Sequence, residues 1–400
     1  MLNPHGRAFR VLLGAQSMVS SLAVDMSLPA LPAITASFAT SAARAQLTIG
    51  FYLLGYASGQ LFYGPLSDRF GRRPILLIGM TIYTLSGFFC ALAPTIDSMI
   101  ALRLLQGFGG AAGVVVTRAA ARDYFHGSEL AQTLSSITAV QAFGPLLAPV
   151  IGGVLATHFD WWMIFLVQGS FAGAMLIATW AGFGESLQQR DLHAIRPGRL
   201  LANYWTFFSN PRCIGFALVS ACVFGGLFIV LSASPFVLIG VYGLSSEAYG
   251  FFFGASVLGY MVGSFGNRRL LRSAVQSETL LRWGLVILIA AALAMLVFAA
   301  KMWGGVAGIM GPYVIYCFAI SLVQSNAIAA AMEPVPHMAG TGASLMGAIQ
   351  MACAAIGGFI VDLFFDGTGT PMGIGMASAA IGATIFYWLI ARRNRPGVPV

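Results

Sequence analysis

Two ionisable residues, Asp25 and Arg103, interrupt long apolar stretches of the sequence. A charged group at the centre of a membrane helix costs roughly 2.5 to 3.5 kcal/mol, so such groups usually face a protein-lined cavity and serve a function. A carboxyl group can exchange a proton with that cavity, and no His lies deep in an apolar stretch. We therefore expect Asp25 to carry protons and Arg103 to act with it. At about 1.5 Å per residue the two could share one layer, which leaves open direct contact or coupling through substrate and water.

The composition places these residues in a membrane protein. The 400 residues are 58% hydrophobic and only 8% charged, whereas soluble domains carry about 25% charged residues. A hydrocarbon core of about 30 Å needs helices of about 20 apolar residues. We expect an all-α membrane protein with twelve transmembrane helices, near residues 9–33, 45–64, 75–94, 98–120, 131–156, 162–182, 213–239, 248–266, 280–300, 304–330, 340–363 and 372–391.

The basic residues predict the orientation in the membrane. With twelve spans both termini share one face, and every Lys and Arg except Arg44, Lys301 and Arg103 falls on it. Cytoplasmic loops are enriched in Lys and Arg, so we expect both termini in the cytoplasm. The net charge of +8 then reflects topology and does not indicate a nucleic-acid partner. The first apolar stretch is too long for a signal peptide, so we expect it to be a retained helix.

The chain divides into two similar halves. We expect an N-terminal six-helix bundle over 1–183, a cytoplasmic linker over 184–211 and a C-terminal six-helix bundle over 212–400. The linker is either a solvated loop or an amphipathic segment on the anionic leaflet. Residues 54–59, L-G-Y-A-S-G, match 258–263, L-G-Y-M-V-G, in the corresponding span of the second half. This repeat favours a duplicated transporter with its substrate site between the halves.

Three further motifs have a physical interpretation. Residues 64–74 read G-P-L-S-D-R-F-G-R-R-P, in which Gly64 and Gly71 permit close packing and a tight turn and Asp68 can pair with an arginine. Span four carries R-L-L-Q-G from Arg103. Span five reads G-P-L-L-A-P-V-I-G-G, where Gly144, Gly152 and Gly153 allow helices to approach and Pro145 and Pro149 bend the span.

The 64–74 string resembles the signature loop of the major facilitator superfamily. That resemblance implies a charge network of Asp68 and Arg72, with Asp123 as third partner, that helps to hold an outward-open state. The second half reads G-N-R-R-L at 266–270 and lacks the aspartate, so we expect a one-sided network. The R-x-x-Q-G string resembles a motif implicated in proton transfer, and the span-five string resembles the antiporter motif of drug exporters.

Together with V-D-M-S-L-P-A-L-P at 24–32, these strings resemble the bicyclomycin and chloramphenicol resistance (Bcr/CflA) subfamily. The resemblance covers nearly the whole chain in span order, with its specific motifs in the N-terminal half. It implies export of small, uncharged or cationic amphiphilic drugs in exchange for protons across a bacterial inner membrane. It also implies a monomer in membrane lipid, with the proton as coupling ion and neither cofactor nor metal.

A drug pocket of this kind should be apolar and aromatic with a few polar groups. The candidates, besides Asp25, are Tyr52, Tyr56, Gln141, Phe224, Phe228, Met346 and Gln350. Helical aromatic stripes also serve packing or face lipid, so these assignments leave a structural role open. Asp362 falls at the outer end of span eleven, where we expect it to be exposed at the interface.

Two other functions remain as alternatives. Proton-linked uptake, or export of a metabolite, could use the same fold, although the span-five string favours drug export. A membrane enzyme acting on lipid is a remote alternative, because no H-E-x-x-H, D-D-x-x-D or G-x-S-x-G string occurs. The five cysteines form no C-x-x-C pair and predict neither disulfide nor metal site. We therefore expect a transporter and no enzymatic activity.

Overall fold

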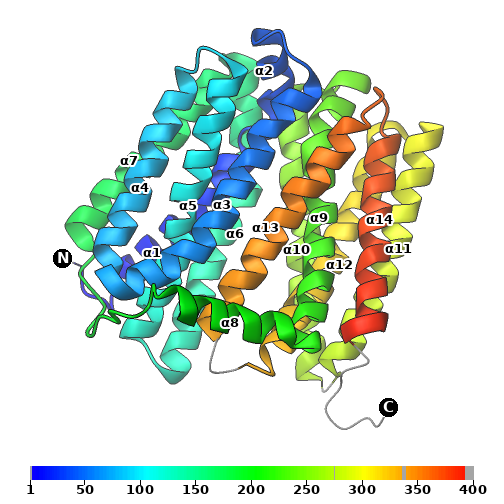
Figure 1. Ribbon diagram of the computed structural model, residues 1–400. Coiled ribbons are helices and arrows are strands. Elements are labelled where there is room, and N and C mark those ends of the chain that lie inside the picture. The colour runs from blue at the N-terminus through cyan, green and yellow to red at the C-terminus, as the bar shows by residue number, and fades with distance from the viewer. Residues whose placement is uncertain (1, 274, 336–338, 392–400) are drawn as a thin grey trace.

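The computed structural model describes residues 2–273, 275–335 and 339–391, and this part of the chain is helical without a β-strand (Figure 1). The long helices are α1 (Arg7–Asp25), α3 (Ala42–Phe70), α4 (Arg72–Ala91), α5 (Ile96–Tyr124), α6 (Gly127–His158), α7 (Trp162–Gly182), α9 (Pro211–Pro235), α10 (Ser246–Arg272), α11 (Ser277–Lys301), α12 (Gly305–Met332), α13 (Ala339–Leu363) and α14 (Thr370–Phe386). Shorter elements are η1 (Leu28–Ala30), α2 (Leu31–Ser37), α8 (Pro197–Ser209), η2 (Phe236–Val241) and η4 (Tyr387–Ala391).

The predicted all-α membrane fold is confirmed. Within the described ranges, eleven helices are long and apolar enough to cross a membrane. The predicted span that is not among these eleven is the second, 45–64, which corresponds to α3; this helix has 29 residues but carries Gln46 and Gln60 among its buried positions. Gln46 and Gln60 are buried between helices, so the low mean hydropathy of α3 does not reflect exposure to water.

The internal repeat makes equivalent contacts in the two halves. In α3, a Cβ on Gly55 or Gly59 would meet the carbonyl oxygens of Leu104 and Phe108 in α5. In α10, the matching Gly259 and Gly263 would meet the carbonyl oxygens of Val314 and Phe318 in α12. In both halves the two glycines are one helical turn apart, and so are the two carbonyl groups that they meet. The same contact between two helices therefore occurs once in each half. The fold is thus two pseudo-symmetric bundles, and the boundaries at 183/184 and 211/212 stay a prediction.

The two halves are in contact at the end of the molecule that carries η1, which we call the η1 end. There α6 meets α10, because a Cβ on Gly153 would collide with the Ser246 carbonyl oxygen. Ser246 Oγ donates to the Pro29 carbonyl at 3.2 Å, and Gln46 Nε2 donates to the Ser232 carbonyl at 3.1 Å. Each of these contacts joins an N-terminal-half residue to a C-terminal-half residue.

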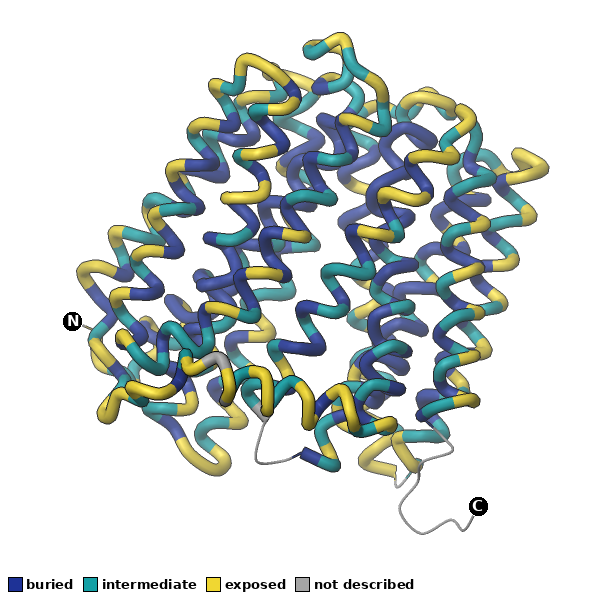
Figure 2. Tube along the Cα trace, in the orientation of Figure 1, coloured by how far each residue is buried: buried dark blue, intermediate teal, exposed yellow. Residues whose placement is uncertain are grey.

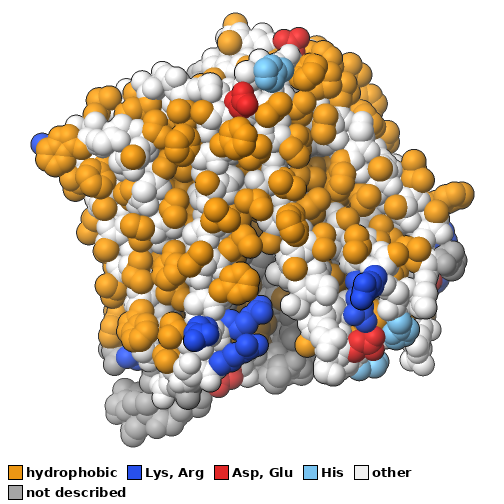
Figure 3. Space-filling model, turned by 180° about the vertical axis from the view of Figure 1, so that it is seen from behind, with side chains coloured by type: hydrophobic (Ala, Val, Ile, Leu, Met, Phe, Trp, Pro, Cys, Tyr) orange, Lys and Arg blue, Asp and Glu red, His pale blue; other side chains and the backbone are white. Residues whose placement is uncertain are grey.

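The opposite end carries α8, the start of α1 and the end of η4, and we call it the α8 end (Figure 1). An open cleft of about 460 Å³ lies there, lined by Ser264, Asn267, Arg268, Leu271 and Arg272 of α10 and Ser325 of α12. Blue Lys and Arg side chains gather towards this end in Figure 3, below a broad hydrophobic surface. Arg392, Arg393 and Arg395, which the sequence assigns to the same face, lie outside the described residues.

The linker stretch contains a helix, α8, whose Pro197 occupies the first turn, where a missing N–H costs nothing. Trp205, Leu201 and Phe208 on α8 are exposed. An exposed apolar face on a short helix at the end of a membrane bundle is typical of an interfacial segment. Among the two interpretations left open for 184–211, the structure favours the amphipathic segment over a simple loop.

The outside of the bundle is apolar, as a lipid-facing surface requires. Figure 2 shows exposed residues on the outer faces of the helices and buried residues between them. Exposed large side chains such as Leu85, Trp180 and Val286 lie on different helices, α4, α7 and α11. All five cysteines are free thiols.

Candidate functional site

Asp25 is the last residue of α1, because the sequence after it cannot continue a regular helix. Pro29 has no N–H to donate, and Ser27 Oγ donates to the carbonyls of Ala23 and Val24 at 3.0 and 2.8 Å. The chain passes through a 3₁₀ turn, η1, before α2 begins. This break fixes the Asp25 carboxyl at one level of the bundle, between the two halves.

The Asp25 side chain is 9% exposed, and within the described ranges its carboxyl makes no hydrogen bond or ion pair. Its electrostatic neighbours are Tyr249 of α10 and Tyr313 of α12, both in the C-terminal half. A buried carboxyl without a cation beside it is most stable as the neutral acid. The geometry therefore suits a group that gains and loses a proton.

Arg103 of α5 is completely buried and lies inside the N-terminal half. Its guanidinium donates to the Thr48 carbonyl at 3.3 Å, to Gln106 Oε1 at 2.6 Å and to the Ala23 carbonyl at 3.0 Å. It also stacks over the Tyr52 ring, at 4.5 Å from the ring centroid. The guanidinium is therefore held between helices and does not extend to the membrane interface.

Arg103 contacts the segment of α1 that carries Asp25. Arg103 binds the backbone of Ala23, two residues before Asp25, but the two charges form no ion pair. Gln168 of α7 also donates to the Ala23 carbonyl, at 3.3 Å, and accepts from Gln106 at 3.4 Å. Arg103 thus braces the backbone that carries Asp25, and any coupling between the two runs through that backbone or through a ligand.

The C-terminal half presents an aromatic group to Asp25 that the sequence analysis missed. Tyr249 stacks on Phe253 at 4.6 Å between ring centroids, and Phe253 lies 5.2 Å from Tyr313. Ser234 and Tyr249 share a hydrogen bond of 2.9 Å between their hydroxyls. In the internal repeat, Leu104 and Phe108 of α5 are equivalent to Val314 and Phe318 of α12. Arg103 and Tyr313 directly precede Leu104 and Val314, so these two residues are equivalent as well. The repeat could have indicated that Tyr313 occupies the position equivalent to Arg103.

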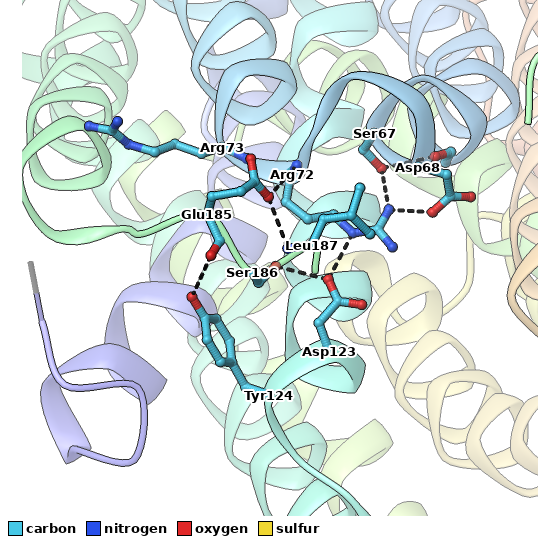
Figure 4. Close-up of polar contacts among 10 residues, drawn as sticks. Ser67, Asp68, Arg72, Arg73, Asp123, Tyr124, Glu185, Ser186 and Leu187 are labelled. Atoms are coloured by element: carbon cyan, nitrogen blue, oxygen red, sulfur yellow. Dashed lines mark hydrogen bonds and ion pairs between the residues drawn. The ribbon is translucent and has the colours of Figure 1, made fainter. Parts of the chain in front are cut away.

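The charges of the 64–74 loop form a network at the α8 end (Figure 4). Arg72 donates through Nη1 to Asp68 at 2.5 Å and to Ser67 Oγ at 2.7 Å, and through Nε to Asp123 at 3.0 Å. The structure thus brings together Asp68, Arg72 and Asp123, the three residues named from the sequence. Ser186 Oγ adds a hydrogen bond to Asp123 at 2.8 Å.

Glu185 belongs to the same network and was not predicted. Its carboxylate accepts from the backbone N–H groups of Arg72, at 2.9 Å, and Arg73, at 3.3 Å, at the start of α4. Gly71, at φ +108°, leaves room for this carboxylate, which a Cβ would meet. Among the described residues every partner in the network lies in the N-terminal half or in the segment before α8. In this conformation it ties that half together and does not bridge to the other.

The two glycines of the loop differ. Gly71 is required by its backbone angle, whereas a Cβ on Gly64 would meet only Val115 Cγ1, at 4.0 Å. The expectation of close helix packing at Gly64 was therefore wrong. Its neighbour Pro65 lies inside the continuous helix α3, so this stretch is helical and the turn begins at Gly71.

The span-five string lies in α6 between α1 and α10. A Cβ on Gly144 would press on Met18 and Ser21 of α1, and one on Gly152 would collide with the Met26 carbonyl. Pro149 and Gly153 face α10 instead, since the Pro149 carbonyl lies against Gly250. Pro145 and Pro149 are both accommodated within one unbroken helix. Pro149 and Gly153 therefore lie at the contact between the halves, whereas Gly144 and Gly152 pack within the N-terminal half.

The predicted pocket residues are largely buried in this conformation. Tyr52 donates to the Ser20 carbonyl at 3.1 Å and stacks on Tyr56, at 6.4 Å between centroids. Phe224 and Phe228 pack together on α9 at 5.0 Å between centroids. Met346 is buried and Gln141 is half-buried.

Gln350 has a partner within its own half. Its amide donates to Ser220 Oγ at 2.7 Å, and Ser220 donates to Gln324 at 2.9 Å. This chain of hydrogen bonds connects α13, α9 and α12. Both glutamines therefore take part in hydrogen bonds between helices of the C-terminal half.

Asp362 is buried, with 6% of its surface exposed, so the predicted interfacial exposure was wrong. Its position at the end of α13 is as expected, but Gln46 of α3 and Ser232 of α9 cover it. Hydropathy locates a residue along its own helix and contains no information about which neighbouring helices pack over it.

Comparisons with known proteins agree with this architecture. A family model described as Major Facilitator Superfamily matches residues 13–360. The chain is 32% identical over 395 residues, 96% of each chain, to a Haemophilus influenzae protein named bicyclomycin resistance protein homolog. It is 29% identical over 373 residues, 90% of this chain and 85% of the other, to a Pseudomonas aeruginosa protein named chloramphenicol resistance protein. Among solved structures, a bacterial homolog of the human lysosomal transporter Spinster, inward-facing and occupied, aligns with a TM-score of 0.75 and 17% identity, covering 99% of this chain and 98% of that one.

Proposed function

The chain belongs to the major facilitator superfamily, and from that premise we propose that it exports small amphiphilic drugs across a bacterial inner membrane in exchange for protons. The relatives described above carry drug-resistance names, which favours drug export over other transport. The family consists of transporters, so the proposal involves no chemical conversion of the substrate.

The observation that carries the proposal is the setting of Asp25. Its carboxyl lies at the end of α1 without a hydrogen bond or ion pair among the described residues, and its electrostatic neighbours, Tyr249 and Tyr313, belong to the other half. A group in that place senses both the separation of the halves and the arrival of a ligand between them. Ionisable residues within membrane spans generally mark such pathways.

In the proposed cycle, bound drug and a proton on Asp25 exclude one another. Drug entering from the α8 end displaces the proton, the halves rock, and a proton arriving at the η1 end releases the drug. Arg103 keeps the Asp25 segment of α1 in place through the Ala23 carbonyl. Alternating access by rocking of two repeats around a central site is the general mechanism of such folds.

The drug site of this proposal lies between Asp25 and the aromatic side chains of both halves. Tyr249, Phe253 and Tyr313 join Phe224 and Phe228 as the residues that offer apolar, aromatic surface. Aromatic rings attract cations and also pack against uncharged amphiphiles. This suits neutral drugs such as chloramphenicol as well as lipophilic cations.

The proposal includes an orientation. The concentration of Lys and Arg at the α8 end supports cytoplasmic termini (Figure 3). The conformation described here is then closed towards the outside by α6 and α10. The exposed face of α8 would rest on the inner leaflet lipid. We propose a monomer with the two bundles and linker divided as the sequence predicts, and the proton as the coupling ion.

Everted membrane vesicles test this function. With the vesicle interior acidified, wild-type protein should accumulate chloramphenicol, bicyclomycin or a lipophilic cation, and Asp25→Asn should not. Asp366→Asn is the matched control, because Asp366 is an exposed carboxylate outside the spans. Proton-driven accumulation that survives in Asp25→Asn would refute the assigned role. Loss of substrate from acid-interior vesicles would instead indicate proton-linked uptake.

A further inference from the structure

A second buried carboxyl, that of Asp362, lies outside the site described above. It belongs to the last turn of α13, 6% exposed, and its Oδ1 has no hydrogen-bond partner. Within the membrane an ionised carboxylate without a partner is strongly disfavoured, so a buried acid of this kind usually has a function. Neither the fold nor the Asp25 cycle uses it.

Asp362 borders a small cavity formed by three helices. The cavity measures about 10 Å³ and is lined by Gln46 and Leu53 of α3, Phe228 and Ser232 of α9, and Asp362 with its neighbours on α13. That is space for about one water molecule. Gln46 Oε1 is also buried without a partner. Two residues that line one small cavity therefore each carry an acceptor oxygen without a partner, and a proton on Asp362 would supply a hydrogen-bond donor there.

The cavity lies across the boundary between the halves. Gln46 comes from the N-terminal half and donates to the Ser232 carbonyl in the C-terminal half at 3.1 Å. Separating the halves at the η1 end would break this hydrogen bond and expose Asp362 to water on that side. The arrangement thus links the ionisation of Asp362 to the closure of the η1 end.

No second charged group lines this cavity. On the helices packed against α13, Arg44 of α3 pairs with Asp97, and Arg212 of α9 pairs with Glu333 at the other end of the molecule. Asp68 and Arg69 of α3 lie at the α8 end, where Asp68 pairs with Arg72. The remaining ionisable groups of α3, α9, α12 and α13 are Tyr and Cys side chains, and none of them lines the cavity: Cys213, Cys222, Cys353, Tyr52, Tyr56, Tyr63, Tyr313, Tyr316 and Cys317. α14 has no Asp, Glu, Lys or Arg. The exposed Asp366, in the loop between α13 and α14, accepts a hydrogen bond from Thr368. Burial and Ser232 are the local influences on Asp362.

We propose that Asp362 is a second proton-binding site, occupied when the halves are closed at the η1 end, so that two protons enter for each drug molecule exported. This rests on the proposed function. One proton travels on Asp25 and one on Asp362, both taken from outside water and delivered inside. Phe228 forms part of the cavity wall and is also a candidate drug contact, which connects the two sites.

The ratio of protons to drug can be measured in liposomes that contain the purified protein. With the membrane potential clamped at zero, the chloramphenicol gradient that stops net flux is read at a series of pH gradients. Each coupled proton contributes about a tenfold drug gradient per pH unit. Wild type should sustain about 100-fold per pH unit with two protons, and Asp362→Asn about tenfold with one. Asp366→Asn should match wild type.

The outcomes separate this proposal from the function on which it rests. If Asp25→Asn abolishes coupling while Asp362→Asn keeps the wild-type slope, the second site is refuted and proton-coupled export stands. If the wild-type slope is zero, both proposals fail. If the wild-type slope depends on Na⁺ in place of pH, the coupling ion is not the proton and both proposals fail.

A second readout needs no transport and no drug. The infrared carbonyl band of protonated carboxyl groups, recorded on purified wild type at neutral pH, should contain a component that is missing in Asp362→Asn and present in Asp366→Asn. Gln46→Leu, which removes the facing acceptor but keeps the acid, should retain and shift that component. An identical carbonyl band in wild type and Asp362→Asn would show that Asp362 is ionised and overturn the proposal.

Discussion

Replacing Gly153 with alanine should open the molecule at the η1 end. The added Cβ would collide with the Ser246 carbonyl oxygen and come within 3.1 Å of the Glu247 Cα, both in α10. These are backbone atoms, so relief requires α6 and α10 to move apart. Overpacking of this kind costs about 1 to 3 kcal/mol. The closed conformation should therefore lose about 5- to 150-fold in population relative to the open one.

Two other glycines, Gly64 of α3 and Gly152 of α6, provide controls. A Cβ on Gly64 would meet only Val115 Cγ1, at 4.0 Å, so Gly64→Ala should leave the equilibrium unchanged. A Cβ on Gly152 would collide with the Met26 carbonyl, which belongs to the same half. Gly152→Ala should lower thermal stability in every conformation without favouring the open one.

The assay is a pulsed electron paramagnetic resonance measurement between spin labels at Leu92 and Met302. These exposed residues directly follow α4 and α11 at the η1 end, one in each half. Labels on unnatural amino acids leave the native cysteines in place. Gly153→Ala should shift the distance distribution to longer values. A distribution equal to that of wild type and Gly64→Ala would show that the α6–α10 contact does not hold this end closed.

Three further predictions follow from the hydrogen bonds. Arg103→Lys should lower both the melting temperature and proton-driven export, because an ammonium group cannot make all three hydrogen bonds of the guanidinium. If both quantities equal those of the wild type, Arg103 does not hold the Ala23 backbone in place. Asp123→Asn should lower the stability of the purified protein by about 1 to 3 kcal/mol and Asp68→Asn by less than about 1 kcal/mol. The reason is that the Asp68 side chain is 45% exposed and that of Asp123 only 19%. Calorimetry in detergent measures both stabilities, and equal losses in the two variants would contradict this prediction. Gln350→Leu should reduce melting temperature and leave drug affinity unchanged, because its amide is bonded to Ser220; a selective loss of drug affinity, measured by equilibrium binding, would instead make it a ligand contact.

The sequence was sufficient for the fold because span length and apolar composition are properties of single helices. Span six, expected at 162–182, coincides with Trp162–Gly182. Other helices extend past their predicted spans, as α3 does from Ala42 to Phe70, because a helix continues beyond the hydrocarbon that hydropathy detects. The break after Asp25 was visible in Pro29 and Pro32, but its division into η1 and α2 was not.

Contacts between helices were predictable only where a motif specified them. The string around Asp68 and Arg72 named its own partner, whereas Glu185 reaches the start of α4 from a segment more than 100 residues away with no local signal. Asp362 shows the same limit, since its burial depends on Gln46 and Ser232 from two other helices. Tyr249 and Tyr313 were missed because tyrosines are common in membrane helices and only the geometry places these two near Asp25.

The central claim is that drug and proton compete at Asp25. It is tested most directly by adding chloramphenicol, florfenicol, bicyclomycin or a lipophilic cation to detergent-purified protein and recording proton release in weakly buffered solution over a series of pH values. Wild type and Asp366→Asn should release protons when drug binds, and Asp25→Asn should bind drug without releasing that proton. Equal release from wild type and Asp25→Asn, or drug binding without release from either, would contradict the account.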